Sequence, residues 1–247
     1  MCINSGRVIH VKLKMKTLYI IICAVLFCAF AIILFSAFSD VKVSAEIPAE
    51  KQTIIIDAGH GGEDGGAEVD GVLEKDINLN ISLILCDMLK ANGYEVKMVR
   101  DSDISVYSDG AETLSEKKTS DLHNRLNLFN SDENNIVVSI HQNKFDNSKY
   151  SCTQVFYSVN NENSVILAES IRTAIVMLLQ PDNTRELKPS SKDIFILDQA
   201  AVPAIIVECG FLSNDEERQK LTDEAYQKKM AYAIMLGVME FCSKQET

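Results

Sequence analysis

The stretch TIIIDAGHGG, residues 53–62, passes from an apolar run directly into a glycine-rich segment. The run Thr53–Ile56 is short and rich in β-branched residues, which predicts a buried strand. The glycines around His60 allow the backbone to turn tightly and leave an open rim there; they are Gly59, Gly61, Gly62, Gly65 and Gly66. The pattern therefore predicts a strand that delivers a histidine to an open edge of the fold.

Short apolar runs alternate with longer amphipathic ones through the rest of this body. Further strands are predicted at Tyr94–Val99, Ile136–Ile140, Thr153–Ser158 and Ala204–Val207, with an edge strand at Asp193–Leu197. Helices are predicted at Asp76–Ala91, Asp121–Phe129, Glu162–Leu179 and Asp223–Phe241, and a polar surface loop at Ser102–Thr119. This alternation indicates an α/β sandwich with a largely parallel sheet, in which sites lie beyond the carboxyl ends of the strands.

Two histidines and two acids fall at those strand ends or beside them. His60 and His141 each follow a predicted strand, Glu208 ends another, and Glu74 lies on the connection that leaves the first. Two histidines and one carboxylate are typical of catalytic zinc, which lowers the pKa of bound water to roughly 7. A second carboxylate, which does not bind the metal, can take the proton of the attacking water and pass it to the leaving nitrogen. We therefore expect one zinc site, with one acid for each role.

Each of these residues also has a simpler explanation. A single histidine at a strand end is more often structural, and an acid before a helix is favoured by the helix dipole. Glu208 is harder to explain in this way, because a carboxylate that closes a buried run needs a partner. A phosphate-binding loop is the alternative for the glycine cluster, but the cluster lacks the Lys-Ser/Thr ending of a P-loop and the GxGxxG spacing. We expect His123 to be a surface or packing residue.

The 247 residues carry a formal net charge of −11, which divides unevenly along the chain. Residues 1–45 have a net charge of +4 and contain the apolar run Leu18–Phe38, long enough to cross a ~30 Å hydrocarbon core. The basic flank predicts a cytoplasmic N-terminus and an exported body. The length of the run favours an uncleaved membrane anchor, although Val43-Ser44-Ala45 resembles a signal-peptide cleavage site. We expect a leader over 1–45, a linker over 46–52 and a catalytic domain over 53–247.

The acidic body argues against a nucleic-acid partner, because such partners are held mainly by Lys and Arg on phosphates. Beyond the leader the net charge is −15. The chain also has no tryptophan, so it provides few aromatic side chains for stacking on bases. The body cysteines show neither a disulfide framework nor a CxxC site, which predicts buried single thiols, with one bridge in an exported body as the alternative. They are Cys86, Cys152, Cys209 and Cys242.

Four motifs, in order, resemble a known family, the zinc-dependent N-acetylmuramoyl-L-alanine amidases of type 3. They are IDAGHGGEDGGA (56–67), LEKD (73–76), SIHQN (139–143) and VECGFLSN (207–214). The resemblance spans roughly Thr53 to Phe241 and implies a three-layer sandwich with a mixed six-stranded sheet flanked by helices. It also implies that His60, Glu74 and His141 bind one Zn²⁺ and that Glu208 is the catalytic acid–base. The implied substrate is peptidoglycan, cut between N-acetylmuramic acid and the L-alanine of the stem peptide.

Finer features resemble the germination-specific spore-cortex amidases, whose products are converted to muramic-δ-lactam. These features are the apolar leader, the polar insertion 102–119, the segment DLHNRL (121–126) and the absence of a wall-binding repeat. The resemblance implies action at the cell wall or between the forespore membranes, with an activator protein left open. The alternatives are a vegetative amidase in cell separation, a zinc carboxypeptidase on stem peptides and a non-catalytic wall-binding regulator. Arg185 is a candidate for binding a substrate carboxylate, and a plain surface role fits it equally.

Overall fold

The computed structural model describes residues 52–245 of the 247-residue chain, together with residues 20, 22, 24 and 26. The chain divides into two units, Met1–Ala49 and Glu50–Thr247. The predicted leader and linker fall almost entirely outside the described residues, so the membrane anchor remains a prediction. In the part of the chain that the structure describes, no helix is both long and apolar enough to cross a membrane.

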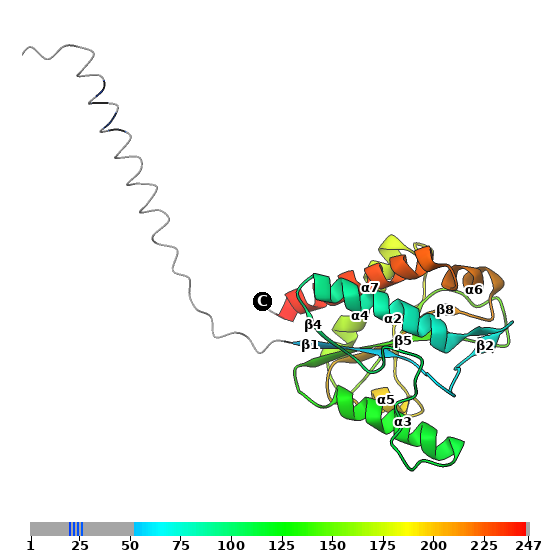
Figure 1. The fold of residues 1–247 in the computed structure, drawn as a ribbon. Coiled ribbons are helices and arrows are strands. Elements are labelled where there is room, and N and C mark those ends of the chain that lie inside the picture. Colours follow the sequence, from blue (N-terminus) through cyan, green and yellow to red (C-terminus); the bar gives the residue numbers. More distant parts are fainter. Residues whose placement is uncertain (1–19, 21, 23, 25, 27–51, 246–247) are drawn as a thin grey trace, which may run out of the picture. The chain divides into compact units, whose positions relative to one another are not determined.

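Six strands form one sheet in the order β4–β1–β5–β8–β6–β7 (Figure 1). The four strands β4 (Glu95–Met98), β1 (Thr53–Ala58), β5 (Asn135–Asn143) and β8 (Ala204–Phe211) pair in parallel. β6 (Gln154–Tyr157) runs antiparallel to β8, and β7 (Lys188–Pro189) pairs in parallel with β6. The sheet is therefore mixed and mostly parallel, which confirms the predicted fold class.

Helices cover both faces of this sheet, giving three layers (Figure 1). One face packs against α2 (Glu74–Ala91), α4 (Asn163–Leu178) and α7 (Glu224–Gln245). The other face packs against α3 (Leu114–Phe129) and the short α5 (Phe195–Asp198). Because strand side chains alternate between faces, Ile54 and Ile56 enter the first core while Ile55, between them, enters the second. The buried run that opens the body is thus apolar on both sides.

Several boundaries differ from those expected. Asp193–Leu197 is not an edge strand, because its last three residues lie in the helical turn α5, and the edge strands of the sheet are β4 and β7. The expected loop 102–119 is helical from Leu114, because Thr113 and Glu116 form a reciprocal capping box. The hairpin of β2 (Glu68–Val69) and β3 (Val72–Leu73) and the helix α6 (Asp215–Leu221) were not predicted. Cys86, Cys209 and Cys242 are buried, as expected, whereas Cys152 is only half-buried.

Candidate metal centre and active site

The sheet register places His141 and Glu208 side by side. They are partners on the parallel strands β5 and β8, and both face α3, because Ile140 and Val207 before them enter the opposite core. Both strands continue past these residues, to Asn143 and Phe211. The two side chains therefore project from within the carboxyl-terminal parts of their strands, rather than at or just beyond the predicted strand ends.

His60 and Glu74 complete the cluster from two other elements. His60 follows β1 with a φ of 61°, and Glu74 is the first residue of α2 rather than a residue before it. The carboxylate oxygen Oε1 of Glu74 lies 3.3 Å from Nε2 of His60 and 2.9 Å from Nδ1 of His141. One donor atom from each residue lies within 4.8 Å of the other two. The three side chains thus face a common point that can hold a metal ion.

Two of the glycines are required by the closeness of these side chains. A Cβ on Gly59 would lie 2.3 Å from the His141 ring, and one on Gly66 would lie 2.6 Å from Oε2 of Glu74. Gly66 also has a φ of +68°, a conformation that favours glycine. These two glycines therefore make room for the histidines and the carboxylate.

Backbone amides hold the carboxylate of Glu74 in place. The amide of Ala67 donates to Oε2 at 2.8 Å, and the amide of Gln142 donates to Oε1 at 3.0 Å. The side-chain amide of Asn78 donates to the same Oε1 at 3.2 Å and to the carbonyl of Gly59. These bonds join α2, β5 and the loop after β1 around one carboxylate, so its orientation is fixed before any ligand binds.

Asp64 orients His60 from the side away from the cluster. Its Oδ2 lies 2.9 Å from Nδ1 of His60, which leaves Nε2 of the ring directed at Glu74. Metal-binding histidines are usually oriented by such a partner on their second ring nitrogen. Asp64 was not among the residues predicted from the sequence. Its signal is the four-residue spacing from His60 within one glycine-rich loop.

The cluster favours a positive charge at its centre. Burial lowers the pKa of His60, but hydrogen bonds with Asp64 and Glu74 outweigh it and raise that pKa to about 9. Burial raises the pKa of Glu74, but His141 and His60 hold it well below its ordinary value. Two imidazoles and a carboxylate that attract a cation in this way match the ligand set of catalytic zinc.

Glu208 remains outside this hydrogen-bonded cluster. Its side chain is half-buried, and Oε2 is enclosed without a hydrogen-bond partner among the described residues. Burial raises the pKa of this carboxyl to about 7. The partner expected for a carboxylate at this position is therefore not supplied by the described side chains, and the group can carry a proton near neutral pH.

A buried ion pair supports the loop that carries His60. Arg125 of α3 pairs with Asp57, and its Nη2 donates to the carbonyl of His60 at 2.8 Å. Asp57 is fully buried and accepts a 2.6 Å hydrogen bond from Ser139. Asp121 pairs with Nε of the same arginine. From the sequence, Arg125 was placed only within the predicted helix Asp121–Phe129, and Asp57 was assigned no role.

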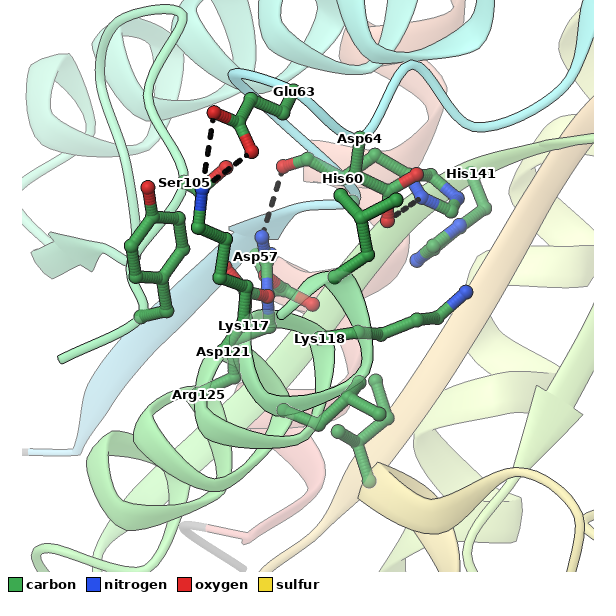
Figure 2. Close-up of a pocket in the computed structure, with 15 residues that line it drawn as sticks. Asp57, His60, Glu63, Asp64, Ser105, Lys117, Lys118, Asp121, Arg125 and His141 are labelled. Carbon is green, nitrogen blue, oxygen red and sulfur yellow. Dashed lines mark hydrogen bonds and ion pairs between the residues drawn. The ribbon is translucent and has the colours of Figure 1, made fainter. Parts of the chain in front are cut away.

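A cavity of about 260 Å³ opens beside the two histidines, between the sheet and α3 (Figure 2). His60 and His141 line one part of it, and side chains of α3 line another. His123 does not line it; that ring is exposed and packs against Phe195 with centroids 4.9 Å apart. Arg185 also lies outside its lining, with its guanidinium 4.7 Å from the Phe211 ring centroid. The structure thus brings together His60, Glu74, His141 and Glu208. His123 and Arg185 lie outside this group.

Residues 54–240 match the protein family described as N-acetylmuramoyl-L-alanine amidase. The chain belongs to this family. Membership confirms the predicted hydrolysis of the amide between N-acetylmuramic acid and L-alanine, with peptidoglycan as the implied substrate. A cell-wall substrate in turn implies that the amidase acts outside the cytoplasm.

Individual relatives agree with this assignment. The amidase is 32% identical to the germination-specific N-acetylmuramoyl-L-alanine amidase of Bacillus subtilis, over 81% of this chain and 83% of the relative. It is 30% identical to the amidase LytC of the same species, over 78% of this chain but only 36% of LytC. The structure of the CwlD amidase from Clostridioides difficile, in complex with the GerS lipoprotein, matches with a TM-score of 0.75 and 39% identity, covering 78% of this chain and 99% of that one.

Proposed function

We propose that this amidase is zinc-dependent, with one Zn²⁺ held by His60, Glu74 and His141, and with Glu208 as the catalytic acid–base. The observation that carries the proposal is the convergence of three donor atoms within 4.8 Å, beside a carboxylate that takes no part in their hydrogen bonds. Three protein ligands leave a further position open, as catalytic zinc sites require.

The residues of the chain divide the chemistry between them. When bound, zinc supplies a Lewis acid that polarises the scissile carbonyl and acidifies water. Glu74 and His60 are kept in position by the Ala67 amide and by Asp64, so their donor atoms need no rearrangement. With a pKa near 7, Glu208 takes a proton from the attacking water and delivers it to the L-alanine nitrogen as the amide bond breaks.

We place the amidase in spore-cortex maturation, where removal of stem peptides precedes formation of muramic-δ-lactam. The similarity to the germination-specific amidase of Bacillus subtilis supports this role, because it extends over most of both chains. LytC supports the alternative of a vegetative wall amidase, but this chain covers only a third of it. CwlD forms a complex with the GerS lipoprotein, so we include a lipoprotein activator among the partners to be tested.

We further propose that the catalytic unit is exported and held at the membrane by the apolar leader. The support is the sequence of residues 1–45, with its basic flank followed by the run Leu18–Phe38. Fractionation of cells that carry a tagged protein tests this directly. A tag found in the culture medium on a fragment shortened near Ala45 would show a cleaved leader instead.

Digestion of purified peptidoglycan tests the activity and the metal together. Zinc-loaded protein should release whole stem peptides with a free L-alanine amino terminus, a chelator should abolish the release, and added zinc should restore it. Release of single amino acids would indicate a carboxypeptidase. No hydrolysis by the zinc-loaded protein, with or without a lipoprotein activator, would favour the non-catalytic regulator.

Muropeptide profiles of spores with and without the gene test the cellular role. Loss of muramic-δ-lactam from the cortex, together with a defect in germination, is the expected result. Spores with unchanged lactam but cells that fail to separate would assign the amidase to the vegetative wall.

A further inference from the structure

The cavity beside the metal cluster contains three cationic side chains, and two of them are neutralised by acids of the same wall. Arg125 pairs with both Asp57 and Asp121. Lys117 contacts the carboxylate of Glu63 at 2.9 Å, and its ammonium lies 5.2 Å from the ring centroid of Tyr107. Each of these two cations is therefore already paired with an acid.

The third cation, Lys118, is the next residue along α3 and also lines the cavity. In Figure 2 its side chain extends toward the part of the cavity where His141 lies, and away from Glu63. Within residues 52–245, no carboxylate lies within the 4.0 Å of an ion pair from its ammonium group. Asp64, the nearby acid whose pKa it helps to lower, is already bound to His60 at 2.9 Å. Lys118 is thus an exposed cation in the lining of the active-site cavity, without an ion-pair partner in the part of the chain that the structure describes.

The rest of the cavity suits part of a peptide rather than a free ion. Leu114, Leu122 and Ile196 add apolar side chains to its lining. In a stem peptide, the residue after L-alanine is D-glutamate joined through its γ-carboxyl, which leaves its α-carboxylate free. That carboxylate lies about two residues from the scissile carbonyl, a span of roughly 7 Å. A substrate whose amide bond lies at the histidines can therefore place this carboxylate within the cavity.

We propose that Lys118 binds the α-carboxylate of the D-glutamate in the stem peptide, and that the cavity between α3 and the sheet is the stem-peptide subsite. This inference rests on the proposed function, and it names the part of the substrate that the site reads. It assigns to Lys118 the binding of a substrate carboxylate, for which the sequence had suggested Arg185. The guanidinium of Arg185 instead lies over the Phe211 ring and donates a hydrogen bond to the Ser151 carbonyl.

Paired substrates test the proposal. Two synthetic N-acetylmuramoyl tripeptide amides share L-alanine and L-lysine and differ only in the second residue, which is D-glutamate in one and D-isoglutamine in the other. Wild-type protein should have a kcat/KM about tenfold higher for the carboxylate substrate, which corresponds to ~1.4 kcal/mol. Lys118→Met should remove this preference by raising KM for the carboxylate substrate while leaving the carboxamide substrate unchanged.

Lys229→Met is the matched control, because Lys229 is an exposed helical lysine on α7, on the opposite face of the sheet. It should behave as wild type with both substrates. A third substrate with diaminopimelate in place of lysine distinguishes the α-carboxylate of D-glutamate from the side-chain carboxylate of diaminopimelate. A Lys118-dependent preference seen only with diaminopimelate would overturn the assignment to D-glutamate. Equal loss of both glutamate and isoglutamine activities in Lys118→Met, or no preference in the wild type, would also overturn it. Failure of the wild type to cut any of the three substrates would instead refute the proposed function, and this inference with it.

Discussion

Replacement of Gly59 by alanine tests whether the glycine exists to make room for a metal ligand. The new Cβ would lie 2.3 Å from Cε1 and Nε2 of His141 and 2.7 Å from Nδ1, whereas ordinary contact begins near 3.4 Å. The ring must therefore retreat by about 1.1 Å. Metal–ligand distances tolerate only about 0.2 Å, so the ring cannot both clear the methyl group and keep its place in the cluster.

We expect Gly59→Ala to weaken zinc binding by about 10- to 100-fold, the size of effect seen when the orientation of a ligand is disturbed. Competition with a chromophoric chelator measures this affinity, and circular dichroism verifies the fold. Gly71→Ala is the matched control: Gly71 has a φ of +78°, and nothing lies within 4 Å of its added Cβ. That variant carries backbone strain in the β2–β3 hairpin without touching the cluster, so it should lose stability but keep its zinc affinity.

Zinc affinity equal to wild type in a folded Gly59→Ala protein would refute this reasoning, because it would mean that His141 is not held against Gly59 by a bound metal. Equal losses of affinity in Gly59→Ala and Gly71→Ala would also refute it. The effect would then come from the general loss of a glycine rather than from the contact with the ring.

Three further predictions follow from the same region. Glu208→Gln should lower turnover at least ~100-fold while zinc content, measured by metal analysis, stays at one per chain, because the group that carries the proton is lost; retained turnover would contradict its role. Arg125→Met should lower the free energy of unfolding in urea by about 3–5 kcal/mol, because it leaves Asp57 buried without its partner; a loss no larger than that of Lys229→Met would contradict the ion pair's importance. The chelator-treated protein should lose thermal stability as the pH rises from 6.5 to about 9. The raised pKa of His60 means that its pairing stabilises the fold fully below pH 6.5 and is lost through about 9. A His60→Gln variant should flatten this slope, and an unchanged slope would contradict the assignment.

The order of the elements and the principal chemistry were accessible from local sequence. Apolar runs such as Thr53–Ile56 identify buried strands because burial on both faces leaves no polar alternation. His60, His141 and Glu208 were recognisable as a set, because two histidines and a carboxylate at the ends of such runs match the ligands and proton carrier of a zinc hydrolase, although a single histidine there is more often structural. Predictions failed where the signal was short or ambiguous. Asp193–Leu197 is apolar enough for a strand, but β7 forms that edge of the sheet. The capping box at Thr113 lies in a polar stretch that resembles a loop.

The sequence by itself thus determined the fold class and predicted four residues of the candidate centre, because these depend on periodicity and on residue type at strand ends or beside them. Only the tertiary structure decided which groups hold and surround that centre. Arg125 meets Asp57 across 68 residues of chain, and Glu74 meets His141 across 67, through the parallel pairing of β1 with β5 and the packing of α2 and α3 on the sheet. The direction of Lys118 into the cavity depends on the rotation of α3 against the sheet. Such contacts leave no local pattern, because they are set by three-dimensional packing of segments that are distant in the chain.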